Sequence, residues 1–256
     1  MLYEWELTIP ELTGSAMRRA YVYLPEGWEA EEEKRYPVLY MFDGHNVFFD
    51  DHATYGKSWG MLEYMEESGT EVIIAAVECN HAPNGGRLME YAPFSFRDPK
   101  LGSIPGRGRE TMEWLVNVFK PFVDAHFPTL PERENTFIAG SSMGGLMSLY
   151  AVTAYNRVFS RAAALSPSVW AGVRKLNHLF ETAPLDPDTV IYMDYGSREM
   201  NFHPRMLDQF TRVASIFLRR RVSLTCRITP GGDHCEACWE KQIPIFMNIL
   251  QYRDYK

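Results

Sequence analysis

The segment Thr136-Phe-Ile-Ala-Gly-Ser-Ser-Met-Gly-Gly145 decides the fold of this chain. A short apolar run leads into Gly-x-Ser-x-Gly at residues 140–144, and a helical pattern follows over residues 146–151. This is the strand, sharp turn and helix in which such a serine forms an elbow. The turn strains the backbone at Ser142, and the glycines let strand and helix approach closely. We expect the Ser142 hydroxyl to project at a helix N-terminus, where the dipole favours negative charge.

Two other interpretations of this segment compete with that one. A glycine-rich turn between a strand and a helix also occurs without any chemistry, as in many nucleotide-binding folds. Ser141 is a second hydroxyl within the same turn. The register of the elbow selects Ser142 as the nucleophile, so we interpret Ser141 as a turn residue.

Apolar runs typical of buried strands recur on both sides of the elbow. Strands are predicted at residues 2–9, 18–24, 38–42, 72–77, 136–139, 162–165, 190–193 and 222–228. Helical patterns lie at residues 61–67, 111–126, 145–155, 204–219 and 236–252. This alternation predicts one α/β domain over residues 1–256, with a mostly parallel sheet and helices on both faces. The first two strands, joined by a short connection, should form an antiparallel edge.

The segment 79–109 interrupts the alternation and is rich in glycine, proline and aromatic residues. A long loop in a compact domain is usually functional or disordered. Tyr91, Phe94 and Phe96 give this segment apolar content, so we expect it to form a pocket wall or a lid. The alternative is an ordered surface loop that does not touch the substrate.

Composition restricts the class of protein. The chain has 256 residues, 46% of them hydrophobic and 23% charged, as expected for one soluble globular domain. The net charge of −7 does not favour a nucleic-acid partner, and the run Arg219-Arg220-Arg221 suits a solvated helix C-terminus. Neither a signal peptide nor an apolar stretch long enough to cross a membrane is visible. With four cysteines in no framework pattern, we expect a cytoplasmic protein that does not bind membranes.

A serine nucleophile needs a base, and the base needs an orienting acid. In hydrolases with this elbow the chain order is serine, acid, histidine, which restricts the base to His178, His203 or His234. His234 follows a predicted strand and the turn 230–233, so it should lie where open α/β sheets bind ligands. We interpret His178 and His203 as surface or capping residues.

Two carboxylates qualify as the acid, because both follow the predicted strand 190–193. Asp194 lies directly at the strand end, and Glu199 lies beyond the Gly196-Ser197 turn. We favour Glu199, which can reach a histidine on the neighbouring strand, and we keep Asp194 as the alternative.

The oxyanion of an acyl-transfer reaction requires two backbone N–H donors. The N–H of Met143, directly after the nucleophile, is one candidate, and the loop 43–46 should supply the other. Gly44 allows an unusual backbone in this loop, so we select the N–H of His45. The side chains of His45 and Asn46 either face the substrate or pack within the loop.

The segment His234-Cys235-x-x-Cys238 raises the possibility of a metal site, to which Cys79 or Cys226 would add a fourth ligand. A strong zinc signature has paired cysteine clusters, and this chain has one. Cys235 and Cys238 also suit one face of the last helix as small buried residues. We therefore predict no metal and no cofactor, and we keep a regulatory disulfide as an alternative.

Six segments together resemble the “putative esterase” family of the α/β-hydrolase fold, from about Tyr36 to the C-terminus. They are Tyr36-Pro-Val-Leu-Tyr-Met-Phe-Asp-Gly-His-Asn-Val-Phe-Phe49, Arg87-Leu-Met-Glu-Tyr91, Leu130-Pro-Glu-Arg-Glu-Asn135, Gly140-Ser-Ser-Met-Gly-Gly-Leu146, Leu165-Ser-Pro-Ser-Val-Trp170 and Gly231-Gly-Asp-His-Cys-Glu-Ala-Cys-Trp239. That family includes esterase D, feruloyl and acetyl xylan esterases, and enterochelin-type siderophore esterases. The resemblance implies Ser142 as nucleophile, His234 as base, an acid within residues 196–199 and Trp170 in the cleft. We also expect Asn46, Arg87 and Tyr91 to contact the substrate.

The sequence thus predicts a serine esterase that acts through an acyl-enzyme on a small-molecule ester. The expected substrates are acetyl-type or feruloyl-type esters of sugars or aryl alcohols. A siderophore (trilactone) esterase is the alternative, and it would use basic residues of the long loop to bind an anionic ligand: Arg87, Arg97, Lys100, Arg107 and Arg109. A hydrolase-fold protein that only binds its ligand is the alternative from another class. The oligomeric state is not predicted.

Overall fold

An eight-stranded sheet forms the centre of the protein, seen in a computed structural model that describes residues 1–30, 32–201 and 206–252. Its order is β1-β2-β4-β3-β7-β8-β9-β10. The strands are β1 (Leu2–Thr8), β2 (Met17–Tyr23), β3 (Val38–Met41), β4 (Ile73–Val77), β7 (Thr136–Ser141), β8 (Arg161–Leu165), β9 (Val190–Gly196) and β10 (Ser223–Thr229). β2 pairs antiparallel with both β1 and β4, and all other neighbours are parallel. The predicted α/β class with an antiparallel edge is confirmed.

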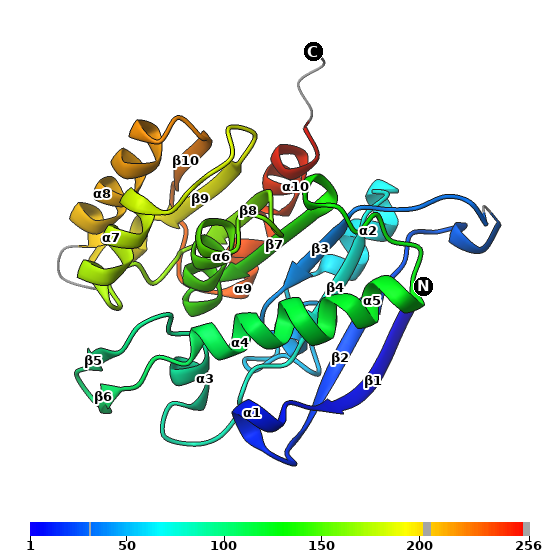
Figure 1. Cartoon of the computed structure of the whole chain (residues 1–256), viewed down its shortest axis with the longest axis horizontal. Coiled ribbons are helices and arrows are strands. Elements are labelled where there is room, and N and C mark those ends of the chain that lie inside the picture. The colour runs from blue at the N-terminus through cyan, green and yellow to red at the C-terminus, as the bar shows by residue number, and fades with distance from the viewer. Residues whose placement is uncertain (31, 202–205, 253–256) are drawn as a thin grey trace.

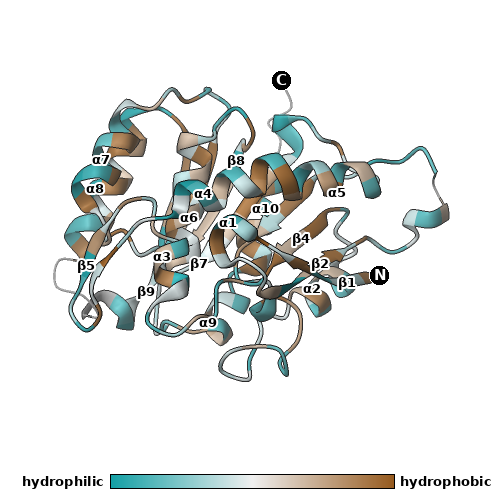
Figure 2. Ribbon diagram, turned by 60° about the horizontal axis from the view of Figure 1, so that its bottom comes forward, coloured by the Kyte–Doolittle hydropathy of each residue, from teal (hydrophilic) through white to brown (hydrophobic). Residues whose placement is uncertain are grey.

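Helices cover the sheet in two layers (Figures 1 and 2). One hydrophobic cluster unites the sheet with α4 (Gly108–Trp114), α5 (Lys120–His126), α6 (Met143–Ala154), α7 (Val173–Thr182) and α8 (Met206–Arg219). A second cluster on the opposite face contains side chains of α2 (Met61–Ser68), α9 (Glu236–Glu240) and α10 (Ile243–Gln251). The hydropathy colouring of Figure 2 shows brown helix surfaces turned toward the sheet.

The central strands read as continuous apolar runs because both of their faces are buried. In β3, Val38 and Tyr40 belong to one cluster, whereas Leu39 and Met41 belong to the other. Successive side chains of a strand point to opposite faces, so each face of this strand requires its own apolar residues.

Several segments differ from the predicted elements. The helix expected at residues 111–126 contains a π-helical segment, Leu115–Phe119, between α4 and α5. The helix expected at residues 236–252 is divided into α9 and α10, and a proline occupies the first turn of α10, where its missing N–H costs nothing. The helix expected from Pro204 is described from Met206, and His203 also lies outside the described residues. Two short helices, α1 (Pro10–Thr13) and α3 (Gly86–Glu90), were not predicted.

The segment 79–109 is not a plain loop. It contains α3 and the hairpin of β5 (Phe96–Asp98) and β6 (Gly102–Ile104), which lie beside the sheet in Figure 1. In the part of the chain that the structure describes, no helix has both the length and the apolar character needed to cross a membrane.

Candidate active site

Three residues with a strained, positive-φ backbone lie at the carboxyl ends of three adjacent strands. Five described residues other than glycine have a positive φ, and three of them follow or end β3, β7 and β8. These are Asp43 (59°), Ser142 (57°) and Ser166 (44°). Such conformations cost on the order of 1–3 kcal/mol each and cluster at functional sites. This edge of the sheet is therefore the strongest candidate for a functional site.

The turn around Ser142 is the sharp elbow that the sequence predicts. Ser142 has φ 57° and ψ −118° and directly precedes α6. Its N–H donates to the Leu165 carbonyl at 2.9 Å. Glycine is required at position 140, because a Cβ there would lie 2.7 Å from the carbonyl carbon of Gly144. Met143 is the first residue of α6, so its N–H has no acceptor within the helix.

A network of hydrogen bonds centred on Glu199 lies at the same end of the sheet as this elbow. His234 Nδ1 is 2.6 Å from Glu199 Oε2. The other carboxylate oxygen of Glu199 accepts from the Ser166 hydroxyl at 2.7 Å and from the Gly196 N–H at 2.8 Å. The Ser166 hydroxyl in turn accepts from the Trp239 indole at 3.0 Å, and the Trp239 ring packs edge-on against His234. Glu199 is thus held by three donors in a position that is 3% exposed.

Asp194 has a different environment, although it lies on β9, the strand that directly precedes the Glu199 turn. Its carboxylate accepts from the Tyr192 hydroxyl at 2.7 Å and from the Ser166 N–H at 3.3 Å. Burial raises the pKa of Asp194 to about 6. The carboxylate recorded in contact with His234 is that of Glu199.

Backbone contacts hold the loops of Glu199 and His234 together. The Arg198 N–H donates to the Gly232 carbonyl at 3.1 Å, and the Gly231 N–H donates to the Ser197 hydroxyl at 2.8 Å. A Cβ at Gly196 would overlap the Gly232 backbone, so glycine is required where the two loops cross. The distance between acid and histidine is consequently determined by the loop backbones.

A cavity of about 530 Å³ opens in front of these groups. Its wall combines the elbow, the loop after β3, the first part of the segment 79–109 and the start of α9. The lining residues are His45, Asn46, Thr54, Tyr55, Cys79, Asn80, His81, Ala82, Gly85, Gly86, Arg87, Leu88, Ser141, Ser142, His234, Glu236 and Trp239. Ser142 and His234 therefore face the same cavity, and residues 79–88 form one of its walls.

The loop after β3 places the N–H of His45 toward the same end of the sheet. Asp43 begins a 3₁₀ turn, Gly44–Asn46, whose first internal hydrogen bond runs from the Asn46 N–H to the Asp43 carbonyl. The His45 N–H precedes this bond and has no acceptor within the turn. Arg87 makes two 2.7 Å contacts with the Asp43 carboxylate. Burial alone would raise the pKa of Asp43, but the Arg87 guanidinium holds it below its usual value.

The residues expected to contact substrate divide into two groups. Asn46 and Arg87 line the cavity. Tyr91 is 1% exposed, and its hydroxyl accepts from the Asp43 N–H at 3.1 Å, so it supports the loop after β3 from behind. Trp170 packs edge-on against Phe96 of the hairpin and is absent from the described lining of the cavity.

Several residues of this site were not predicted from the sequence, among them Ser166, Glu236 and Trp239. Ser166 and Trp239 form the chain behind Glu199, and Glu236 is a cavity residue that is 6% exposed, so its burial raises its pKa. A weak signal existed for two of them, because they follow His234 by two and five residues in the first turn of a helix. Ser166 lies within one of the segments that resemble the family, but no pattern in the sequence assigned it a role.

The cysteines and the other histidines that the structure describes do not belong to the hydrogen-bonded network around Glu199. His178 is exposed on α7. All four cysteines are free thiols, and the Cys238 sulfur accepts from the Asp233 N–H at 3.2 Å. Among the described residues, the side chains grouped closely enough to hold a metal ion are those of His45, Cys79 and His81.

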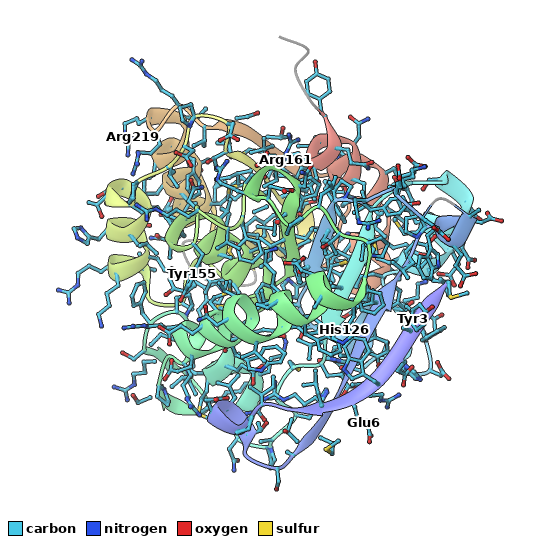
Figure 3. All side chains as sticks on the ribbon, turned by 45° about the vertical axis from the view of Figure 1, so that its right-hand side comes forward. Tyr3, Glu6, His126, Tyr155, Arg161 and Arg219 are labelled. Atoms are coloured by element: carbon cyan, nitrogen blue, oxygen red, sulfur yellow. The ribbon has the colours of Figure 1, made fainter. Side chains whose placement is uncertain are left out.

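The basic run Arg219-Arg220-Arg221 lies at the end of α8. Arg219 lies at the outer end of α8, as labelled in Figure 3. The guanidinium of Arg220 turns back to the carbonyl oxygens of Phe180 and Glu181 at the end of α7. Part of the positive charge of this run therefore caps a helix C-terminus.

Comparison with known proteins gives a consistent result. The model of the family described as “Putative esterase” matches residues 13–245. The uncharacterized protein YbbA of Bacillus subtilis is 24% identical over 246 residues, which are 92% of each chain. The siderophore triacetylfusarinine C esterase of Aspergillus fumigatus is 27% identical over 198 residues, 72% of this chain and 64% of that protein. The solved structure of siderophore hydrolase EstA from Aspergillus nidulans has a TM-score of 0.74 at 19% identity, covering 97% of this chain and 95% of EstA.

Proposed function

The chain belongs to the “Putative esterase” family, and from this premise we propose that it is a serine esterase acting through an acyl-enzyme. The observation that carries the proposal is the 2.6 Å contact between Glu199 and His234, since His234 lines the same cavity as the strained Ser142. A nucleophile, a base and an orienting acid in the order serine, acid, histidine are the parts that such a reaction needs.

In the proposed first step, the Ser142 oxygen attacks the ester carbonyl while its proton moves to Nε2 of His234. Nδ1 is already bonded to Glu199, so Nε2 is the ring nitrogen left to act as base. The N–H groups of Met143 and His45 donate to the oxyanion that develops on the carbonyl oxygen. Each such donor is typically worth about 10²–10³ in rate.

The intermediate then collapses and His234 returns its proton to the leaving alcohol. The acyl group remains on Ser142 as an ester. Water enters, gives a proton to His234 and attacks this ester through the same oxyanion position. Collapse releases the carboxylic acid and restores the Ser142 hydroxyl. Glu199 stays ionised throughout and stabilises the His234 imidazolium, a task for which its fixed, buried position is suited.

The charge of the cavity favours an ester without a strong negative charge. Of the five basic residues considered for an anionic ligand, Arg87 is the one that lines the cavity, and its charge is paired with Asp43. Arg107 and Arg109 are paired with Glu110 and Glu113. A volume of about 530 Å³ fits a ligand of small-molecule size. We therefore propose acetyl-type or feruloyl-type esters of sugars or aryl alcohols as substrates.

A siderophore ester is the second candidate, and one observation favours it. The relative from Aspergillus fumigatus, 27% identical over 198 residues, is a siderophore esterase. The paired state of Arg87 restricts this candidate to ligands that do not need a basic cavity. Hydrolysis rates on a panel of acetyl, feruloyl and siderophore esters distinguish the two candidates.

A fluorophosphonate probe tests the nucleophile directly. We expect one adduct per folded chain, located at Ser142 by peptide mass spectrometry and absent in Ser142→Ala. Ser168 is the matched control, because its hydroxyl lies 3.4 Å from that of Ser142, so Ser168→Ala should still be labelled. Labelling at Ser168, or no labelling of the folded wild type, would contradict the proposal. The second result, together with ligand binding, would favour a protein that only binds.

A further inference from the structure

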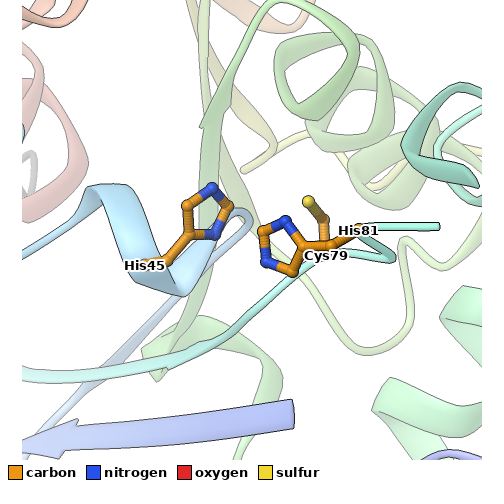
Figure 4. A group of neighbouring side chains, drawn as sticks. All are labelled: His45, Cys79 and His81. Carbon is orange, nitrogen blue, oxygen red and sulfur yellow. The ribbon is translucent and has the colours of Figure 1, made fainter. Parts of the chain in front are cut away.

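Three potential metal ligands converge on one wall of the cavity. His45 follows β3 and both Cys79 and His81 follow β4, the parallel neighbour of β3. Because parallel strands end at the same edge of a sheet, these side chains meet there although 34 residues separate His45 from Cys79. Their nitrogen and sulfur ligand atoms all lie within 4.8 Å of one another. Figure 4 shows the two imidazole rings and the thiol turned toward each other.

The His45 ring has one nitrogen that its surroundings leave unsatisfied. His45 is 4% exposed, and its Nε2 lies 3.0 Å from the Thr54 hydroxyl. Its Nδ1 is buried and has no hydrogen-bond partner among the described residues. A buried polar atom without a partner costs about 1–3 kcal/mol, so an orphan of this kind requires an explanation. If Nε2–H donates to Thr54, Nδ1 presents a lone pair, which is the form of histidine that binds metals.

The neighbouring charges are compatible with a cation. The Asp43 carboxylate lies close to the Cys79 thiol and also binds Arg87. A metal ion on Cys79 would displace the thiol proton and leave a thiolate next to this ion pair. His81 is exposed and can move toward an incoming ion without disturbing the core.

We propose that His45, Cys79 and His81 form a binding site for a divalent transition-metal ion of the zinc class. Two imidazoles and one thiolate are an established ligand set for zinc, which is bound tetrahedrally at about 2.0–2.1 Å from nitrogen and about 2.3 Å from sulfur. These lengths require ligand atoms roughly 3.3–3.7 Å apart. The ligand atoms now lie within 4.8 Å of one another, so binding requires them to approach by at most about 1.5 Å. The exposed His81 is the ligand with the most freedom to move.

The fourth coordination position of such an ion faces the cavity. All three ligands line the cavity that also contains Ser142 and His234. Three protein ligands with one open position are the arrangement of zinc sites that exchange water or substrate, as opposed to closed structural sites. The ion would thus lie beside the loop after β3, where an oxygen of a bound molecule can reach it.

The test uses the full chain, stripped of metal and titrated with Zn²⁺ by calorimetry. We expect one ion per chain. His81→Ala should weaken binding at least about tenfold, because it removes a ligand from an exposed position where the fold does not depend on it. With Co²⁺ as the probe, the wild type should show thiolate-to-cobalt charge transfer, and Cys79→Ser should lose that absorption while circular dichroism verifies its fold.

Two matched controls separate this site from other candidate ligands. The double variant Cys235→Ser/Cys238→Ser removes the cysteine pair next to His234, and His178→Ala removes an exposed histidine on α7. Both should bind Zn²⁺ like the wild type. The proposal is overturned if the wild type binds no stoichiometric ion, if His81→Ala binds as tightly as the wild type, or if the double variant is the one that loses binding. Because no readout depends on ester hydrolysis, failure here is distinguishable from failure of the proposed esterase mechanism.

Discussion

The loops after β9 and β10 and the wall segment 79–109 lie on two sides of the site and differ in how their polar side chains are used. In the two loops, Glu199 and His234 contact each other at 2.6 Å and His234 faces the cavity. In the wall segment, Arg87 is paired with Asp43 and Tyr91 is buried behind the same loop. The position of a side chain in the two short loops follows from the end of the strand before it. In the long wall segment, polar side chains such as Arg87 instead bind other parts of the protein and hold the segment against the sheet.

The buried pair of Arg18 and Glu90 illustrates this second use. Both side chains are 3% exposed, and their contacts are 2.6 and 2.8 Å. Glu90 ends α3, and Arg18 belongs to β2, so the pair ties the wall to the antiparallel edge of the sheet. A polar residue in a long segment is therefore a poor predictor of substrate contact unless its partner is known.

The largest expected effect tests the loop side of the comparison. Glu199→Gln should reduce kcat on p-nitrophenyl acetate by about 10³–10⁴-fold, because a neutral amide neither stabilises the imidazolium nor selects the right tautomer. Asp194→Asn should stay within about tenfold of the wild type, since Asp194 bonds Tyr192 and Ser166. Steady-state kinetics of both variants measure the difference. A larger loss for Asp194→Asn would exchange the two roles.

The next effect is on the stability of the protein and tests the buried ion pair that holds the wall segment 79–109 to the sheet. Arg18→Met leaves Glu90 buried without its partner and should lower the free energy of unfolding by about 3–5 kcal/mol. The matched control is Arg198→Ala, which breaks the exposed pair with Asp233 between the loops after β9 and β10 and should cost less than about 1 kcal/mol. Urea unfolding of each variant measures both values. Equal losses would remove the distinction between the two regions.

A smaller effect is expected when the hydrogen bonds of Ser166 behind Glu199 are removed. Ser166→Ala removes one of the three donors to the carboxylate and leaves the Trp239 indole without its acceptor. We expect kcat to fall by about 10-fold to 100-fold with KM nearly unchanged, because the change acts on the orientation of Glu199 and His234. Thr182→Ala, an exposed change on α7, serves as the control. A change in KM alone would show that Ser166 acts on substrate binding.

The smallest effect concerns the hairpin of the wall segment. Arg97 lies on β5, outside the described lining of the cavity, so Arg97→Gln should change kcat/KM for neutral esters by less than about twofold. The same variant should leave siderophore-ester hydrolysis unaffected if that substrate is processed in the cavity. A selective loss on an anionic ester would bring the hairpin into the binding site and strengthen the second candidate function.

Much of the fold was predictable because its signals are local. All eight strands of the central sheet correspond to predicted segments. The inner strands β3 and β4 are apolar because both of their faces are buried, whereas the outer strands β1 and β10 keep exposed and polar residues. The elbow at Ser142 was equally visible, because a sharp turn with a positive φ requires small residues at defined neighbouring positions. The missed elements α1, α3, β5 and β6 have three to five residues each, too few to show a periodic pattern.

By itself, the sequence determined the α/β class, the positions of the strands along the chain and the position of the elbow. It also determined that His234 is the histidine that follows the last strand. The tertiary structure alone decided which carboxylate contacts His234, that Ser166 and Trp239 lie behind it, and that His45 meets Cys79 and His81. The physical reason is the range of the interactions involved. Periodicity and turn chemistry act over a few residues, whereas the direction of a loop side chain depends on partners that are distant in the chain and become neighbours when the sheet forms.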